Sequence, residues 1–383
     1  MSKGKEQKPV ILQVLPELDH GGVGVGTVQS ADAPRQHGIK NFVASAGGRM
    51  VRELEKIKVP HFTLPLKTKN PIKLYLNSLK LEKIIKENGI NIVHARSRAP
   101  AWSAYWAAKR AGVKFITTFH GTYGLGPKGI KKFYNRVMTY GQLVIAISNH
   151  IKKHITENYR INEDKIRLIH RCVDIEKFSP AVSQERIIRA VQENGIPEDL
   201  PVISLIGRIT RWKGQHVLLE ALSKLKDRDF FCLIVGSDQG RVKYTEELKE
   251  LVKKYGLESK VKFIGQSFDI PALLMVSDIV LSTAVEPEAF GRAAIEGQAM
   301  GKIVIASNLG GSLENTIDGV TGKLYESSDP QALADAIRWA LDLPLEEKKK
   351  ISAAAIKNVK ENFTKQIMCD KTIAVYNELI NMD

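Results

Sequence analysis

The chain of 383 residues is poor in cysteine and has no long apolar run. Its three cysteines, Cys172, Cys232 and Cys369, show no C-x-x-C spacing, which argues against a disulfide framework and a zinc site and favours a reducing compartment. No stretch approaches 18 apolar residues, so we predict no transmembrane helix. The first ten residues have no apolar segment behind them, which predicts no secretory leader. We expect a cytoplasmic protein, soluble or peripheral on the inner face of the cytoplasmic membrane.

Positive charge is concentrated in the first half of the chain. Residues 1–178 hold 31 Lys and Arg against 13 Asp and Glu, a net charge of +18, whereas residues 179–383 hold 26 against 29. Such asymmetry indicates an anionic partner, such as an anionic membrane or a phosphorylated acceptor, and a Lys-rich solvated surface is the alternative. We do not expect nucleic acid, because Trp102 and Trp106 have the helical spacing of core residues.

Short apolar runs alternate with helical segments, which predicts parallel sheets built from βαβ units. The expected strands are 10–15, 41–46, 61–66, 91–95, 114–119 and 143–148 in the first half, and 201–207, 231–236, 260–265, 278–283 and 302–307 in the second. We therefore predict an α/β protein with two doubly wound, Rossmann-like domains, 1–180 and 181–360, that face a cleft. A C-terminal helix at 361–383 is expected to return toward the first domain. In such sheets ligands bind beyond the carboxyl ends of the strands.

A glycine cluster follows the first strand, with glycines at 21, 22, 24 and 26. The dinucleotide-binding spacing G-x-G-x-x-G, counted from Gly22, ends on Thr27, and the second strand ends without the acidic residue that binds ribose. A nicotinamide enzyme is therefore not expected. The cluster predicts a flexible loop that brings backbone N–H groups close to a ligand at a helix N-terminus.

Two cations flank the loop after the first strand of the second half, in the segment GRITRWKGQ at 207–215. Arg208 and Lys213 lie beside the start of a predicted helix, where free N–H groups and two positive charges suit a diphosphate. A solvated basic loop is the alternative interpretation.

Two glutamates mark the segment EPEAFGRAAIEGQAMG at 286–301. If all of it were helical, Glu288 and Glu296 would lie about 12 Å apart, which is too far for the carboxyl pair of a glycosidase. We interpret them as holding hydroxyls at opposite ends of a folded nucleotide-sugar. Phe290 and Gly291, between them, would offer backbone N–H groups to the phosphates.

The first half places further candidates after its strands. His120, followed by Gly121, comes directly after the strand at 114–119 and is interpreted as a site residue, with a structural histidine as the alternative. Arg96 and Arg98 follow the strand at 91–95 and are candidates for contact with a phosphorylated or acidic acceptor, against the alternative of a plain basic loop.

Taken together, these motifs resemble the retaining GT-B glycosyltransferases of family 4, the group 1 glycosyl transferases of bacterial envelope and oligosaccharide synthesis. The E-x7-E motif is Glu288–Glu296, followed by ASNLGG at 306–311. GRITRWKG resembles the family's phosphate-binding loop, Gly21–Gly22 its glycine loop and His120 its active-site histidine. The run HARSRAPAW at 94–102 resembles members that act on lipopolysaccharide-type glycans.

The resemblance implies a role for each matching residue. Arg208 and Lys213 would neutralise the departing diphosphate of a nucleotide-diphosphate sugar, with UDP or GDP the expected nucleotides. Glu296 would bind the ribose and Glu288 the transferred sugar, and His120 would position that sugar. Further donor contacts are implied for Gly21, Gly22, Phe290 and Gly291, and for loops at Gly236 and Gly265. No metal and no cofactor are expected, because Arg and Lys would replace Mg²⁺.

Three departures from the family pattern lie on the acceptor side. Gly24 and Val25 stand where a glutamate and a basic residue are common, Pro34 should end or kink the following helix, and the family's N-G-V-D reads Arg171–Cys172–Val173–Asp174. The sequence therefore leaves an alternative open: a non-catalytic protein that binds nucleotides or polyanions, with a decayed acceptor site.

Overall fold

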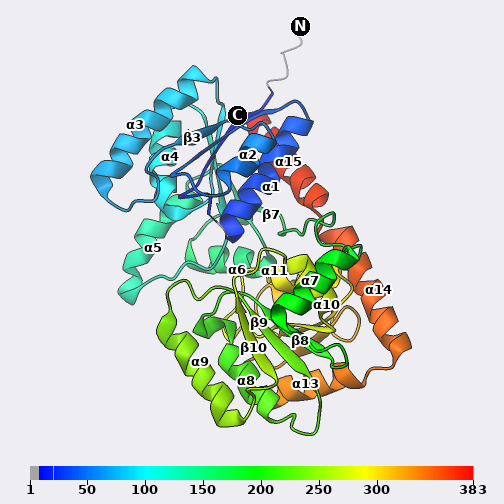
Figure 1. The fold of residues 1–383 in the computed structure, drawn as a ribbon. Coiled ribbons are helices and arrows are strands. Elements are labelled where there is room, and N and C mark those ends of the chain that lie inside the picture. The colour runs from blue at the N-terminus through cyan, green and yellow to red at the C-terminus, as the bar shows by residue number, and fades with distance from the viewer. Residues whose placement is uncertain (1–7, 20, 383) are drawn as a thin grey trace. The chain divides into compact units, whose positions relative to one another are not determined.

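The computed structural model describes residues 8–19 and 21–382. The chain divides into two compact units (Figure 1). Unit 1 comprises Met1–Arg171 with Lys365–Asp383, and unit 2 comprises Cys172–Thr364. Residues 1–7, on which the prediction about a leader rests, lie outside the described residues. No helix in the described part of the chain is both long and apolar enough to cross a membrane.

Unit 1 is built on a seven-stranded sheet in the order β3-β2-β1-β4-β5-β6-β7, with every pair parallel. The strands are β1 (Val10–Val14), β2 (Lys40–Ser45), β3 (His61–Thr63), β4 (Ile92–Ala95), β5 (Lys114–Phe119), β6 (Leu143–Ala146) and β7 (Ile166–Leu168). Chain order reverses between β1 and β4, and a reversal of this kind is where doubly wound sheets bind ligands.

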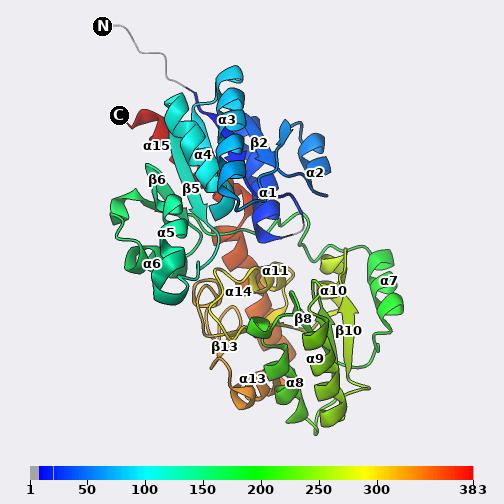
Figure 2. The same cartoon turned by 90° about the vertical axis from the view of Figure 1, so that its left-hand side faces the viewer.

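In the described part of unit 1, seven α-helices connect these strands or return to them. They are α1 (Gly22–Gln36), α2 (Val51–Lys56), α3 (Pro71–Glu87), α4 (Arg98–Ala111), α5 (Ile130–Asn135), α6 (Asn149–Asn158) and α15 (Lys365–Asn381). Both views show α15 beside α1 and α3 beside α4 (Figures 1 and 2). The short 3₁₀ turns are η1 (Pro127–Gly129), η2 (Arg136–Thr139) and η3 (Glu163–Lys165).

Unit 2 repeats the design with six parallel strands in the order β10-β9-β8-β11-β12-β13. They are β8 (Val202–Ile206), β9 (Phe231–Val235), β10 (Val261–Gly265), β11 (Ile279–Ser282), β12 (Ile303–Ser307) and β13 (Lys323–Tyr325). Its helices are α7 (Gln184–Asn194), η4 (Arg211–Lys213), α8 (Gln215–Ser223), α9 (Val242–Tyr255), α10 (Ile270–Val276), α11 (Arg292–Ala299), α12 (Ser312–Asn315), α13 (Pro330–Asp342) and α14 (Leu345–Asn362). Here the reversal lies between β8 and β11.

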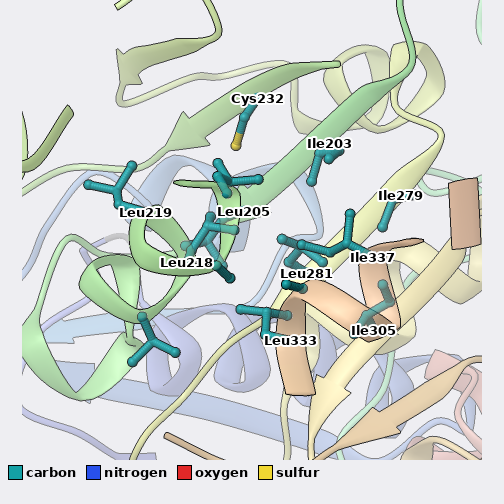
Figure 3. Close-up of a cluster of buried hydrophobic side chains, with 14 of the residues drawn as sticks. Ile203, Leu205, Leu218, Leu219, Cys232, Ile279, Leu281, Ile305, Leu333 and Ile337 are labelled. Carbon is teal, nitrogen blue, oxygen red and sulfur yellow. The ribbon is translucent and has the colours of Figure 1, made fainter. Parts of the chain in front are cut away.

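Successive side chains of each strand point to opposite faces of the unit 2 sheet. Because the strands are apolar throughout, both faces carry apolar side chains, as a parallel sheet covered on both faces requires. Figure 3 shows the larger cluster, in which Leu205 and Leu281 from the sheet meet Leu218 of α8 and Leu333 of α13. A second cluster, around Leu233, covers the opposite face.

All eleven predicted strands are present, and the two-sheet α/β prediction is confirmed. The sequence missed β7 and β13, which have three residues each and contain Arg167 and Lys323, because so short a polar-containing run has no recognisable period. Pro34 lies inside the last turn of α1, which ends two residues later, at Gln36.

Candidate functional site

The predicted donor residues of unit 2 follow the carboxyl ends of neighbouring strands. The loop after β8 carries Arg208 and Lys213, and the loop after β11 carries Glu288. Because β8 and β11 are adjacent in the sheet and their chains then turn in opposite directions, these two loops flank the point where a doubly wound sheet binds its ligand.

The two loops are joined by a direct ion pair. Lys213 Nζ lies 2.6 Å from Glu288 Oε1, with the side chains 14% and 8% exposed. The Ser282 hydroxyl donates a second hydrogen bond, of 3.2 Å, to the same carboxylate oxygen. Glycine makes the approach possible, because a Cβ on Gly214 (φ +71°) would lie 1.9 Å from the Thr283 carbonyl oxygen. A compact cationic and anionic pair therefore lies at the switch point of the sheet.

Arg208 is the exposed cation of this site. No carboxylate in the described part of the chain forms an ion pair with it, and its guanidinium lies 5.8 Å from the Trp212 ring centroid. Lys213 Nζ lies 4.6 Å from the same centroid. Trp212 therefore stands between the two positive charges and orients both side chains.

Of the predicted glycines after β9 and at the end of β10, Gly236 packs against the same loop, and Gly265 is joined to it by a backbone hydrogen bond. A Cβ on Gly236 (φ +148°) would lie 1.9 Å from the Gly207 carbonyl oxygen, so the backbones touch where only glycine fits. The Gly236 N–H donates to the Gly265 carbonyl at 2.7 Å. The three strand ends are thereby held together beside Arg208.

Phe290 and Gly291 lie where the β11 loop enters α11. Gly291 adopts φ +83° as the residue before the helix, and the buried Asn315 side chain donates to the carbonyls of both residues. The Gly311 N–H stabilises the same loop by donating a hydrogen bond of 2.8 Å to the Glu288 carbonyl. The helix begins at Arg292, directly after Gly291.

Glu296 lies within α11 and is buried. Its carboxylate pairs with Arg292 one turn earlier, at 2.5 Å. Both predicted carboxylates are thus engaged by cations of the chain itself, Glu288 by Lys213 and Glu296 by Arg292.

In unit 1, His120 borders a small cavity of about 20 Å³ that Arg96 and Arg171 also line, room for about one water molecule. His120 as a whole is half-buried, but its Nε2 is buried and has no hydrogen-bond partner within the described residues. Burial lowers the pKa of His120 well below its usual range, and the charges of Arg96 and Arg171 lower it further. The imidazole is therefore neutral at pH 7.

A buried hydrogen-bond chain lies beside this cavity. The Tyr376 hydroxyl of α15 and His94 Nδ1 are 2.7 Å apart, and His94 Nε2 lies 2.7 Å from the Thr118 hydroxyl of β5. Burial is the main cause that lowers the pKa of His94 well below its usual range. The C-terminal helix is thus tied, through His94, to β5, the strand that His120 directly follows.

The two predicted acceptor arginines differ in exposure. Arg96 is buried and donates to Gln13, Ser30 and the Gly26 carbonyl. Arg98 is half-buried, donating to Asn135 Oδ1 at 3.1 Å, with its guanidinium 4.4 Å from the Tyr123 ring centroid.

The prediction of a flexible glycine loop was wrong for most of the cluster, because α1 begins at Gly22 and contains Gly24 and Gly26, while Gly21 directly precedes it. Arg171 donates to the Gly22 carbonyl at 2.8 Å, and a Cβ on Gly26 would lie 1.8 Å from its guanidinium nitrogen. A Cβ on Gly24 would lie 2.7 Å from the Asp19 carbonyl oxygen. The departure at Gly24 thus fits a helix start that has no room for a side chain, whereas Val25 is half-buried.

Three residues of these sites were not singled out in the sequence as site residues. Arg171 was noted only as a departure from a motif, and Trp212 and Arg292 only as parts of quoted segments. Trp212 had a local signal, because it stands between two cations in the sequence. Arg292 had one too, because it precedes Glu296 by four residues on a predicted helix. Only the position of Arg171 depends on packing between distant segments.

No group of three or more His, Cys, Asp or Glu in the described part of the chain could hold a metal ion. The chain contains one Asp-x-Asp sequence at Asp227–Asp229, a spacing that occurs in metal-binding motifs. It precedes β9, away from the carboxyl ends of the strands, and Asp227 pairs with Arg338 at 2.5 Å.

Comparison with known proteins identifies the family. The model described as glycosyl transferases group 1 matches residues 187–358, and the model described as glycosyltransferase family 4 matches residues 20–177. A glycosyltransferase from Rickettsia africae is 42% identical in sequence, with a TM-score of 0.91 over 98% of this chain and 100% of that chain.

Other relatives match at lower sequence identity, and some of them match over a smaller share of this chain. Anabaena HepE, solved in complex with UDP and glucose, is 24% identical with a TM-score of 0.83, over 95% of this chain and 98% of that chain. The D-inositol 3-phosphate glycosyltransferase of Corynebacterium urealyticum is 33% identical over 192 residues, 48% of this chain and 44% of that relative. The chain thus spans about half the length of the curated relatives that it matches.

Between them the two family models account for most of both sheets, and the Rickettsia structure matches along its whole length. The chain belongs to the family 4, group 1 glycosyltransferases and has their GT-B fold.

Proposed function

We propose that this glycosyltransferase moves a sugar from a nucleotide-diphosphate sugar, a UDP- or GDP-sugar, to a glycan or lipid-linked acceptor with retention of anomeric configuration. The observation that carries the proposal is the buried contact between Lys213 and Glu288 beside the exposed Arg208, at the switch point of the unit 2 sheet. A site with two cations and a carboxylate suits a ligand with a diphosphate next to sugar hydroxyls.

In this proposal Arg208 and Lys213 hold the diphosphate, while Glu288 accepts hydrogen bonds from hydroxyls of the transferred sugar. Glu296 binds the ribose, and the backbones at Gly236 and Gly265 lie beside the base. The bond between the anomeric carbon and the phosphate oxygen breaks as the acceptor hydroxyl attacks from the same side. The hydroxyl proton passes to the departing diphosphate, whose charge Arg208 and Lys213 stabilise.

We assign the acceptor to the first domain, residues 1–180, and the donor to residues 181–360. His120 positions the sugar, a role that its lowered pKa supports because such an imidazole is a weak base. Arg98, half-buried, would meet an acidic or phosphorylated acceptor directly. Arg96 is buried, so its contribution would pass through Gln13 and Ser30.

The proposed reaction needs no metal. Arg208 and Lys213 supply the positive charge that Mg²⁺ would otherwise bring to the diphosphate, and catalysis then consists mainly of positioning and charge stabilisation. We further propose a role in lipopolysaccharide or other envelope polysaccharide synthesis, on the inner face of the cytoplasmic membrane. The basic first half of the chain supports a location beside anionic lipid.

Calorimetric titration with UDP, GDP, ADP and CMP, with and without EDTA, tests the donor site. We expect one diphosphate to bind equally in both conditions, and Lys213→Ala and Glu296→Ala to weaken it at least about tenfold, the equivalent of one charge-assisted hydrogen bond. The matched controls are Lys226→Ala and Glu250→Ala, at exposed positions of unit 2, which should bind as the parent does.

An assay of sugar transfer distinguishes an active glycosyltransferase from the non-catalytic binding protein that the sequence left as an alternative. If one nucleoside diphosphate binds and the sugar of the corresponding nucleotide-sugar is transferred to a glycan acceptor, the enzyme is active. Nuclear magnetic resonance of the product then gives the anomeric configuration. Binding without transfer to any glycan or lipid-linked acceptor would favour the non-catalytic alternative. Absence of binding to every nucleotide would reject the donor site.

A further inference from the structure

The exposed large apolar side chains of unit 1 gather on two helices. Apart from Met382 near the chain end, those of the described residues all lie on α3 and α5. They are Ile72, Tyr75, Leu76 and Leu79 on α3, and Ile130 and Phe133 on α5. Isolated exposed apolar residues need no explanation, but a group of this kind marks an interaction surface.

On α3 the exposed apolar residues form a continuous stripe. Ile72, Tyr75, Leu76 and Leu79 are 71%, 54%, 50% and 41% exposed and follow the spacing i, i+3, i+4, i+7 of one helix face. The buried residues of the same helix form the opposite face, and they are Leu74, Asn77, Ser78, Leu81 and Ile85. The helix therefore has two apolar faces, and unit 1 covers one of them.

The stripe belongs to a fixed element. Asn70 caps α3 by accepting from two backbone N–H groups, and Pro71 occupies the first turn. Ser103 of α4 donates to the Leu74 carbonyl at 2.7 Å, and Arg110 of α4 pairs with Glu82 at 2.6 Å. These contacts with α4 fix the orientation of α3, so the apolar stripe on its opposite face points away from unit 1.

The second group, on α5, adjoins the same helix α4. Ile130 and Phe133 are 73% and 70% exposed. The Trp102 indole of α4 donates to the Tyr134 carbonyl at 3.0 Å and lies near the Phe133 ring. Both views show α3 and α5 close to α4 (Figures 1 and 2).

Lysines without carboxylate partners accompany both groups. Lys73 and Lys80 on α3, and Lys131 and Lys132 on α5, are exposed, and none of them forms an ion pair within the described part of the chain. The two glutamates of α3, Glu82 and Glu87, are paired with cations. The surface therefore combines apolar side chains with net positive charge.

We infer that α3 and α5 form the surface by which unit 1 docks on an anionic lipid bilayer. An apolar face flanked by lysines suits a helix that lies in the membrane interface, with its apolar side chains among the acyl chains and its lysines at anionic headgroups. A second copy of the chain is a poorer occupant, because a two-fold contact would set these lysines against each other. The inference deepens the proposed lipid-linked acceptor, but it rests on the surface of unit 1 alone.

Co-sedimentation of the full chain with vesicles tests this surface. Vesicles with about 30% phosphatidylglycerol should bind the chain, and pure phosphatidylcholine should bind it much less. Ile72→Ser with Leu76→Ser should lower the partition coefficient at least about tenfold, because two large apolar side chains leave the acyl region. Lys73→Gln and Lys80→Gln should each lower binding to the anionic vesicles about fivefold.

A matched control uses exposed apolar residues of unit 2. Val242 and Leu345 are 59% and 65% exposed, and Val242→Ser with Leu345→Ser should leave vesicle binding unchanged. Calorimetry of the nucleotides on every variant keeps this test separate from the donor site, whose binding should not change. A variant that binds nucleotide as the parent does and still loses vesicle binding would fail only at this surface.

Three outcomes of the vesicle experiments would overturn the inference. These are no vesicle binding by the parent chain, equal binding of the Ile72→Ser/Leu76→Ser variant, and an equal effect of the unit 2 control. A Tyr75→Trp variant gives an independent readout, since brominated acyl chains should quench its fluorescence more than that of the parent. Light scattering that showed a dimer abolished by Ile72→Ser/Leu76→Ser would assign the surface to a second copy instead.

Discussion

Lys213 and Glu288 are 75 residues apart in the chain, yet their charged groups meet at 2.6 Å between the loops that follow β8 and β11. Both side chains are largely buried, and Ser282 shares the same carboxylate oxygen. The contact holds a cation and a carboxylate side by side at the point where the strand order of unit 2 reverses. Because a buried pair leaves an uncompensated charge when one partner is removed, its partners are strongly coupled.

This coupling can be measured by a double-mutant cycle. Lys213→Met alone should lower the free energy of unfolding by about 1–3 kcal/mol, because the Glu288 carboxylate then lacks its cation. The double variant Lys213→Met with Glu288→Gln should lose less than the sum of the single variants, by at least about 1 kcal/mol. Urea denaturation gives the four values, and additive losses would show that the two charges do not interact.

Gly236 should tolerate no side chain. Gly236→Ala should abolish nucleotide binding and lower the unfolding free energy by more than about 3 kcal/mol, because its Cβ would lie 1.9 Å from the Gly207 carbonyl oxygen and part the ends of β8 and β9. Gly240→Ala is the matched control, since Gly240 (φ +81°) has open space around its Cβ position and should cost about 1 kcal/mol. Calorimetry and urea denaturation check both variants, and similar losses would contradict the argument.

Gly26 and Arg171 should behave as one unit. Gly26→Ala sets a methyl group where the Arg171 guanidinium lies, so it should destabilise unit 1 by about 1–3 kcal/mol. Arg171→Ala frees that space, and Gly26→Ala added to it should cost less than about 0.5 kcal/mol. Gly22→Ala, where no atom lies within 4 Å of the Cβ position, is the control in the same helix. Urea denaturation of the four variants gives these free energies. If Gly26→Ala lowers the unfolding free energy as much in the Arg171→Ala background as in the parent, the proposed contact is refuted.

Tyr376 should anchor α15 through its hydroxyl. Tyr376→Phe removes the partner of buried His94 Nδ1 and should lower the unfolding free energy by about 1–3 kcal/mol. Tyr75→Phe, at an exposed ring, should change it by less than about 0.5 kcal/mol. Amide hydrogen exchange in α15 gives a local readout, because faster exchange there is expected only for Tyr376→Phe. Unchanged exchange would mean that the hydroxyl does not hold the helix.

Stability should fall as the solution becomes acidic. Burial lowers the pKa of His94 and His120 well below 6.5 in the folded chain, so below pH about 6.5 the unfolded state binds protons that the folded state does not. The unfolding free energy should therefore decrease from pH 7 to pH 5, by up to about 1.4 kcal/mol per pH unit for each histidine. His94→Gln should make this slope shallower. Urea denaturation at pH 7, 6 and 5 tests this, and a slope unchanged by His94→Gln would exclude that residue as a cause.

The sequence by itself determined the two parallel sheets and the loops that carry the proposed donor residues, because strand period and glycine or charge placement are local properties of the chain. Apolar runs of five or six residues predicted β1 and β9, whereas the three-residue β7 and β13 gained their strand geometry from neighbours in the sheet. The E-x7-E spacing likewise located Glu288 and Glu296 without any structure.

Only the tertiary structure decided which of these residues meet. Arg171 reaches the Gly22 carbonyl across 149 residues of chain, and no local period encodes such a contact. The apolar spacing in the α3 segment fits a helix, but it does not show which of the two apolar faces is covered. Packing against α4 buried Leu74 and left Ile72 and Leu76 exposed, because one layer of neighbouring helices can cover only one face.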